Sequence, residues 1–86
     1  MKDRRLGKFK INRHIIDECP HQVLAIMKNM IIVRAEMHWA FDGIEYVGIH
    51  PAFAAVPHGQ MMPEYYPAIT TNGDATVRKV EWKPCS

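Results

Sequence analysis

The clearest alternation of apolar and polar side chains runs through residues 30–50. The odd-numbered positions from residue 31 to residue 41 are all apolar, and they are Ile31, Val33, Ala35, Met37, Trp39 and Phe41. A period of two is typical of a strand with one buried face and one solvated face. Asp42-Gly43 then interrupts the pattern, and this dipeptide favours a two-residue type I′ turn. We therefore predict a central β-hairpin in which Trp39 lies opposite Tyr46.

A strand and a helix are predicted before this hairpin. Residues 8–16 alternate in the same way and predict a strand, in which Arg13 is the one exception on the apolar side. The helix is predicted at residues 20–29, where Pro20 suits the first turn and Asn29 can adopt the left-handed conformation that ends a helix. Its apolar residues have the spacing of an amphipathic helix, and they are Val23, Leu24, Met27 and Met30.

A second hairpin is predicted near the end of the chain. Residues 64–71 and 76–83 are rich in β-forming residue types and flank the turn sequence Asn72-Gly73-Asp74. Pro67 confines the first of these strands to a sheet edge, because Pro donates no backbone hydrogen bond. The short apolar segment 52–56 fits either an edge strand or a helical turn.

Together these elements predict a single α+β domain, with a four- or five-stranded antiparallel sheet packed against one short helix. The sheet consists of two β-hairpins plus an N-terminal strand. We place a flexible basic arm at residues 1–7, the domain at residues 8–83 and a tail at residues 84–86. The predicted core contains Phe9, Ile11, Ile15, Val23, Leu24, Met27, Ile31, Val33, Met37, Trp39, Tyr46, Val80 and Trp82.

Composition restricts the class of protein but not its activity. With 86 residues, 48% hydrophobic and 23% charged, the chain has the composition of one globular domain. It has no apolar run of about 20 residues, as a membrane-spanning helix needs, and its start lacks the apolar segment of a secretory signal. We therefore expect a cytoplasmic protein without membrane contact. Cys19 and Cys85 are expected to be free thiols.

The net charge of +2 conceals a strong segregation along the chain. Residues 1–34 hold eight Lys and Arg against three Asp and Glu, whereas residues 35–77 hold five acids and no Lys or Arg. The basic arm could bind phosphates through Lys2, Arg4, Arg5, Lys8, Lys10 and Arg13. Most aromatic residues lie in the acidic segment, whereas an RNA-binding sheet interleaves them with basic residues. Nucleic-acid binding is therefore an alternative hypothesis.

Catalysis is a second alternative. Glu36, His38, Glu45 and His14 could converge on one sheet face, as the Glu/His pair of a small ribonuclease does. An alternating strand places polar residues on its solvated face in any case, so this pattern is not specific. The five histidines are dispersed singly and lack the spacing of a zinc site. We therefore expect no enzymatic activity, no bound metal and no cofactor.

The main hypothesis is a small accessory module that binds another protein. One helix can cover only one face of the sheet, and the other face carries a mixture of apolar and polar positions. Two methionines and two tyrosines lie in or beside a proline-bracketed loop, and both residue types are enriched at interfaces. The predicted partner-binding residues are Met61, Met62, Tyr65, Tyr66, Ile32, Val47 and Ile49. The partner is expected to be a second copy, forming a homodimer, or another protein. We associate this profile with small phage or mobile-element proteins.

Overall fold

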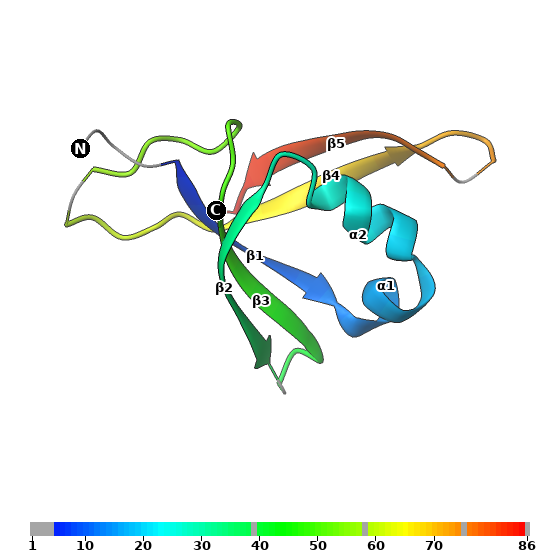
Figure 1. Cartoon of the computed structure of the whole chain (residues 1–86), viewed down its shortest axis with the longest axis horizontal. Helices are drawn as coiled ribbons and strands as arrows, with labels where there is room; N and C mark the ends of the chain where they lie inside the picture. The colour runs from blue at the N-terminus through cyan, green and yellow to red at the C-terminus, as the bar shows by residue number, and fades with distance from the viewer. Residues whose placement is uncertain (1–4, 39, 58, 75, 86) are drawn as a thin grey trace.

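The computed structural model describes residues 5–38, 40–57, 59–74 and 76–85. Their elements follow in the order β1 (Leu6–Asn12), α1 (Arg13–Glu18), α2 (Pro20–Ile26), β2 (Ile31–His38), β3 (Gly43–Ile49), β4 (Tyr65–Thr71) and β5 (Val77–Pro84). The strands form two antiparallel sheets, one in the order β1-β3-β2 and the other a β4-β5 hairpin (Figure 1). The α+β class is confirmed, but the prediction of one four- or five-stranded sheet with a single helix is wrong.

The two sheets meet at one point and then separate. Lys8 and Glu64 form an isolated parallel bridge, and the Lys8 N–H donates to the Pro63 carbonyl at 3.0 Å. Beyond this bridge β4 contains Pro67, which has no N–H with which to continue a ladder towards β1. The strands therefore diverge, and α1 and α2 lie at the open side of the wedge (Figure 1).

The first strand is displaced from its predicted position at both ends. Leu6 and Gly7 belong to β1 and not to a flexible arm, and the strand ends at Asn12. The next six residues form helix α1, and the predicted strand wrongly included the first four of them, residues 13–16. Two i,i+4 pairs support this turn of helix, with His14 Nδ1 2.6 Å from Glu18 and Arg13 Nε 3.5 Å from Asp17. Ile15 and Ile16 are neighbours in the sequence and both pack against the core. Two adjacent residues can share the buried side of a helix but not one face of a regular strand.

Helix α2 begins at Pro20 as predicted but ends at Ile26, three residues early. Asn29 has a φ of 61°, so it adopts the left-handed conformation expected at the helix stop. The buried side of the helix is set by Ile26, whose side chain is 1% exposed, whereas Leu24 is 75% exposed. Leu24 was therefore wrongly assigned to the core.

The β2–β3 hairpin forms, but in a different register from the predicted one. Tyr46 pairs with Ala35 and not with Trp39, and residues 40–42 lie between β2 and β3. Trp39 itself lies outside the described residues. Gly43 is the first residue of β3, and its missing side chain makes room for the Ile11 carbonyl and the Phe41 ring. The glycine thus serves a close approach between strands and not the turn.

The second hairpin agrees well with its prediction. It consists of β4 and β5 around the turn at residues 72–74, and Val80 and Trp82 both pack against the core. The segment 52–56, in contrast, is neither a regular strand nor a helical turn. Phe53 in this segment is fully buried, although the sequence pattern did not identify it as a core residue.

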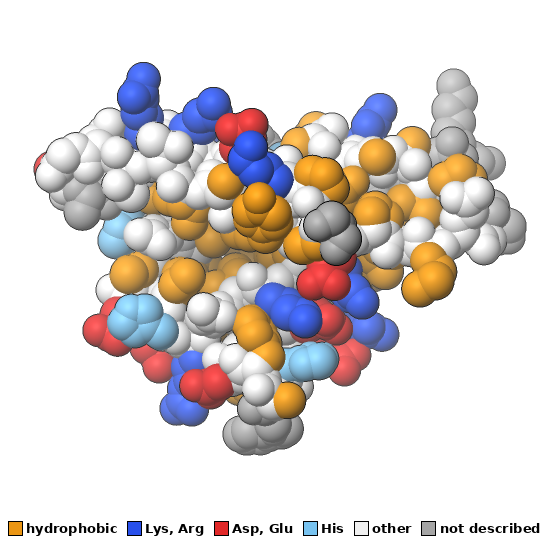
Figure 2. All heavy atoms as spheres, turned by 180° about the vertical axis from the view of Figure 1, so that it is seen from behind, with side chains coloured by type: hydrophobic (Ala, Val, Ile, Leu, Met, Phe, Trp, Pro, Cys, Tyr) orange, Lys and Arg blue, Asp and Glu red, His pale blue; other side chains and the backbone are white. Residues whose placement is uncertain are grey.

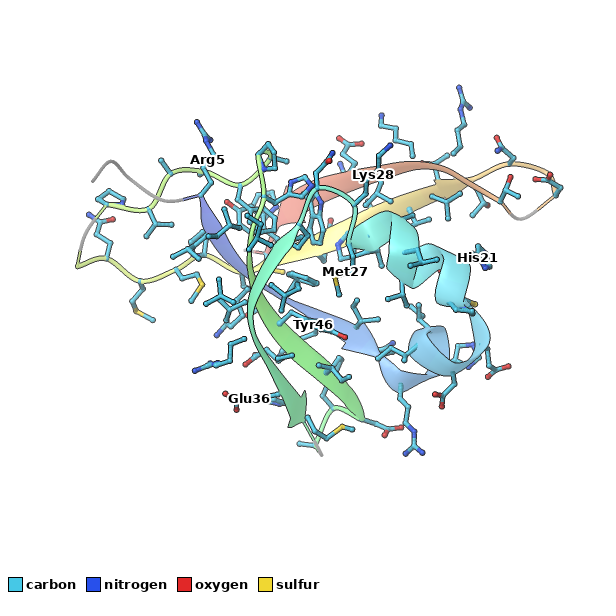
Figure 3. All side chains as sticks on the ribbon, viewed as in Figure 1. Arg5, His21, Met27, Lys28, Glu36 and Tyr46 are labelled. Atoms are coloured by element: carbon cyan, nitrogen blue, oxygen red, sulfur yellow. The ribbon has the colours of Figure 1, made fainter. Side chains whose placement is uncertain are left out.

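The core lies between the three-stranded sheet, α2 and the β4-β5 hairpin. Its buried residues are Phe9, Ile11, Ile26, Phe53 and Tyr65. Tyr46 and Met27 pack against this cluster and are directed towards the same interior region, whereas Glu36 is directed away from it (Figure 3). Three predicted core residues of β2 are exposed instead, with Ile31 at 64%, Val33 at 57% and Met37 at 50%.

The sheet interleaves the basic and acidic segments of the chain. Strand β1 pairs directly with β3, so that Lys10 of the basic segment lies opposite Glu45 of the acidic one. Figure 2 shows the result on one face, where acidic and basic side chains alternate over the lower half of the molecule. The charge segregation in the sequence is therefore largely cancelled in this sheet.

Candidate functional site

Strand β2 is the most unusual surface of the protein. It pairs with β3 along one edge, and within the described ranges no strand pairs with its other edge. Seven of its eight residues are exposed. Four of them are large and apolar, with Ile32 at 41% exposure in addition to Ile31, Val33 and Met37. Such an edge offers unpaired backbone donors and acceptors next to apolar side chains.

A β-bulge explains why the alternation of β2 was misleading. Ile32 pairs with Gly48 and Arg34 with the adjacent Val47, so Val33 is an additional residue. Side chains alternate between the two faces of a strand with a period of two. The extra residue therefore places odd-numbered residues before the bulge and odd-numbered residues after it on opposite faces. Ile31 and Met37 therefore lie on opposite faces, although the sequence places them in one series.

The position of β2 in the sheet explains its exposure. The core cluster and the residues packed against it come from β1, β3, β4, β5, the helices and the adjoining loops, but none of those described comes from β2. The helices and the second hairpin thus cover the inner part of the sheet and leave its outer strand uncovered (Figure 1). The inward-facing side of β2 consequently meets solvent as well.

The other face of β2 carries its ionisable residues. Arg34 Nε lies 3.0 Å from Glu36 Oε1, and His38 Nε2 lies 3.7 Å from Glu45 Oε1 on β3. Glu36 is the cross-strand partner of Glu45. The Glu45 side chain is only 12% exposed, compared with 41% for His38. A carboxylate and an imidazole so placed can exchange a proton after a small movement.

The structure thus brings together three of the four predicted acid–base residues. The fourth, His14, lies on α1 with Nδ1 2.6 Å from Glu18, and both side chains are largely exposed. Neither of the two cavities described below is lined by His38 or Glu45. The group therefore lies on an open sheet face.

The predicted partner-binding residues divide into three classes. Met61 is 94% exposed, Tyr66 48% and Ile32 41%, whereas Met62 and Ile49 are half-buried. Val47 and Tyr65 are each 7% exposed. The Tyr65 hydroxyl accepts a hydrogen bond from the Ala54 N–H at 2.9 Å. Val47 and Tyr65 are therefore covered by other residues of the chain itself.

Several basic residues of the predicted arm contact acceptors within the chain. Arg5 Nη1 donates to the Phe53 carbonyl at 2.8 Å, and Lys10 Nζ lies 3.9 Å from Glu64 Oε2. Arg13 lies near two carboxylates, with Nε 3.5 Å from Asp17 and Nη1 3.8 Å from Asp42. Lys8 is half-buried in β1, and Lys2 and Arg4 lie outside the described residues. These contacts reduce the positive charge that the arm presents to phosphate.

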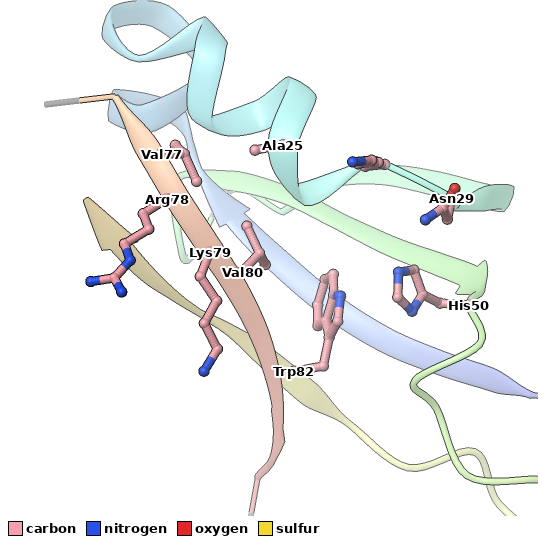
Figure 4. Close-up of a pocket in the computed structure, with 9 residues that line it drawn as sticks. Ala25, Asn29, His50, Val77, Arg78, Lys79, Val80 and Trp82 are labelled. Atoms are coloured by element: carbon pink, nitrogen blue, oxygen red, sulfur yellow. The ribbon is translucent and has the colours of Figure 1, made fainter. Parts of the chain in front are cut away.

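Two cavities lie on either side of the second hairpin. The larger, of about 380 Å³, lies between α2 and β5 (Figure 4). Val80 and Trp82 are directed towards α2, and Arg78 and Lys79 of β5 also line the cavity. The smaller, of about 180 Å³, is lined mainly by apolar residues of β1, β4 and the helices. Apolar atoms in the hollow between the two halves of the molecule are visible in Figure 2.

Other kinds of site can be assessed in the part of the chain that is described. No group of three His, Cys, Asp or Glu side chains there is placed to hold a metal ion. Cys19 and Cys85 are free thiols. Of the helices described, none has the length and apolar character needed to cross a membrane. No protein-family model matches the chain, and no curated protein or solved structure matches it.

Proposed function

We propose that the chain is a small, non-catalytic protein-binding module that pairs the free edge of β2 with a strand of its partner. The observation that carries this proposal is an eight-residue edge strand with seven exposed residues. A partner strand would satisfy the unpaired backbone groups of the edge and cover its apolar side chains. Met61 and Tyr66, which are also exposed, provide a second and smaller contact.

The exposure of β2 is unusual enough to support this role. Monomeric soluble proteins rarely leave a contiguous apolar patch uncovered. They also protect long edge strands, often with charged or proline residues, because such edges recruit other chains. In β2 the charged residues Arg34 and Glu36 lie beyond the bulge, whereas the exposed apolar residues Ile31, Ile32 and Val33 are consecutive and no proline interrupts the strand. An edge kept in this form is typical of a strand that is paired in its working state.

Affinity capture of the partner from the source cell tests the proposal, when the wild-type chain is compared with a variant altered in β2. An Ile31→Lys/Val33→Lys chain should lose the partner, because two charges would be placed where the partner strand packs. Leu24→Lys is the matched control, since Leu24 is exposed on α2. Circular dichroism checks that each variant is folded. Amide exchange in the purified complex should be slowed across residues 31–38.

Retention of the partner by the β2 variant, or protection confined to another segment, would overturn the proposal. Met61→Lys and Tyr66→Lys assign the contribution of the loop. We expect each to weaken capture less than the β2 variant does, because each alters one isolated apolar side chain.

A second candidate function is catalytic, and it is favoured by the 3.7 Å contact between His38 and the nearly buried Glu45 carboxylate. Cleavage of a fluorogenic RNA oligonucleotide tests this candidate. Under our main proposal the wild-type chain shows no turnover. Turnover that is lost in His38→Ala but kept in His14→Ala would establish the catalytic candidate, because His14 also lies beside a glutamate but on α1. Nucleic-acid binding by the basic arm stays a sequence-based alternative.

A further inference from the structure

The regular part of β2 carries two opposite charges separated by one small residue. Regular pairing with β3 begins at Arg34 and continues to His38, after the bulge. Arg34 and Glu36 lie on the same face, and their side chains are 60% and 53% exposed. Ala35 lies between them on the opposite face, where it pairs with Tyr46. When this stretch pairs antiparallel with a second copy of itself, Arg34 of each copy can therefore lie opposite Glu36 of the other.

Pairing of β2 with a second copy is restricted to a few registers. An antiparallel pair of identical strands has a two-fold axis perpendicular to the sheet, and residues directly opposite each other share a face. Neighbouring residues point to opposite faces, so a residue can lie opposite only a residue an even number of positions away in the second copy. The two-fold axis must therefore pass through the level of one residue and not between two residues. An axis at Arg34 opposes two guanidinium groups, and an axis at Glu36 opposes two carboxylates. Like charges directly opposite each other are destabilising.

The remaining registers also differ in length and in regularity. An axis at Val33 falls on the bulge, and an axis at Met37 carries most of the strand beyond its end at His38. An axis at Ala35 has neither defect. It places Arg34 opposite Glu36 of the second copy twice, within the regular stretch that begins after the bulge. Both pairs of opposite charges are then matched.

We propose that the strand accepted by β2 is β2 of a second copy, paired antiparallel about a two-fold axis at Ala35. This inference rests on the proposed function and names its partner. The two three-stranded sheets become one six-stranded sheet, and the contact is closed because each copy uses the same edge. One strand pair is small compared with a standard interface of about 1,600 Å². The dimer is therefore weak and concentration-dependent.

Charge reversal tests the register. Arg34→Glu gives a chain whose β2 presents two carboxylates, and Glu36→Arg gives a chain with two guanidinium groups. Each variant alone opposes like charges across the axis, so its dimer should dissociate about tenfold more readily than the wild-type dimer. An equimolar mixture should dimerise like the wild type, because every opposed pair is then of opposite charge. The measurement is sedimentation equilibrium from about 10 μM to about 1 mM.

The mixture separates contacts between chains from contacts within one chain. Each variant also loses the Arg34–Glu36 ion pair inside its own β2, and mixing cannot restore that pair. Arg78→Glu and Glu81→Arg on β5 make the same charge changes away from β2, and each should dimerise like the wild type. Circular dichroism shows that each chain is folded. Failure of the mixture to recover the dimer would overturn the Ala35 register.

A covalent test uses the residue on the axis itself. Opposed Cβ atoms in an antiparallel pair lie about 4.5–5.5 Å apart, which is close to the separation in a disulfide. In a chain with Cys19→Ser and Cys85→Ser, Ala35→Cys should form a covalent dimer on oxidation. Thr70→Cys, at an exposed position of β4, should not. Equal cross-linking at both positions would overturn the proposal.

A wild-type chain that is monomeric at about 1 mM would also overturn the second copy as the partner. That result leaves the proposed function standing if β2-dependent capture of another protein is observed. If capture does not depend on β2 either, both proposals fail.

Discussion

Phe53 lies flat against Tyr65, with ring centroids 4.4 Å apart and ring planes inclined by 9°. Phe53 belongs to the irregular segment that follows β3, whereas Tyr65 is the first residue of β4. The Phe53 carbonyl accepts a hydrogen bond from Arg5, and the Tyr65 hydroxyl accepts one from Ala54. The stacked pair therefore fixes a loop to a strand in the centre of the core.

Phe53→Ala should lower the free energy of unfolding by about 3–5 kcal/mol, because it leaves a cavity where a fully buried ring was. Leu24→Ala is the matched control, since Leu24 is 75% exposed. We expect a change of about 0.5 kcal/mol or less for the control. Urea unfolding measures both, and equal losses would contradict the assignment of the core.

Gly7→Ala should lower the free energy of unfolding by about 1–3 kcal/mol through overpacking. A Cβ atom at Gly7 would lie 2.7 Å from a ring carbon of Phe53 and 2.7 Å from one of Tyr65. Gly73→Ala serves as the control, because nothing lies within 4 Å of a Cβ at that position. Thermal melts should show a clear loss for the first variant and almost none for the second.

Asn29→Ala should cost about 1–2 kcal/mol, because a residue with an ordinary side chain is strained in the left-handed region. The φ of 61° at Asn29 lies in that region. Asn29→Gly should be as stable as the wild type or more so, since Gly adopts this conformation without a steric penalty. Urea unfolding of the two variants distinguishes backbone strain from the loss of the amide side chain, which both share.

Alkaline pH should destabilise the protein partly through Tyr46. Burial raises the pKa of its phenol above the ordinary value, because the charged phenolate is poorly solvated at this position. Above about pH 10 the unfolded chain then loses this proton more readily than the folded chain does. The unfolded state is thereby favoured, so stability falls as pH rises through the folded-state pKa.

The test compares urea unfolding near pH 9 and near pH 11. Tyr46→Phe should lose less stability between these two pH values than the wild type does. Tyr66→Phe removes a phenol that is 48% exposed and controls for the loss of one tyrosine. Identical pH profiles for wild type and Tyr46→Phe would contradict this role of Tyr46.

Sequence patterns located the regular strands and the second hairpin more reliably than the register between strands. The alternation around Phe9 and Ile11 correctly gave the buried face of β1. Asp42-Gly43 correctly indicated a change of direction near these residues, and Asp42 has a positive φ of 58°, but β2 already ends at His38 and Gly43 belongs to β3. The dipeptide does not reveal that Gly43 is also required for a close approach to β1. That requirement depends on the packing of residues distant in sequence.

Two features of the structure, one in the candidate site and one in the core, have no signal in the periodicity. The bulge at Val33 inserts a residue without breaking the run of apolar positions, so Ile31 was assigned to the wrong face. Phe53 is buried within a segment that has no repeating structure, and a method based on periods does not identify such residues. The exposure of Met37 follows from strand order, because β2 lies outside β3 and beyond the reach of the helices.

The extra residue in β2 gives the hairpin a tolerance for a change in chain length. On either side of Val33, Ile32 and Arg34 already face the consecutive residues Gly48 and Val47. Loss of Val33 would leave every other pair between the two strands as it is. In a strand without a bulge, the same deletion would carry all side chains beyond it to the opposite face. The hairpin therefore contains one position at which evolution can shorten the chain without rebuilding the sheet.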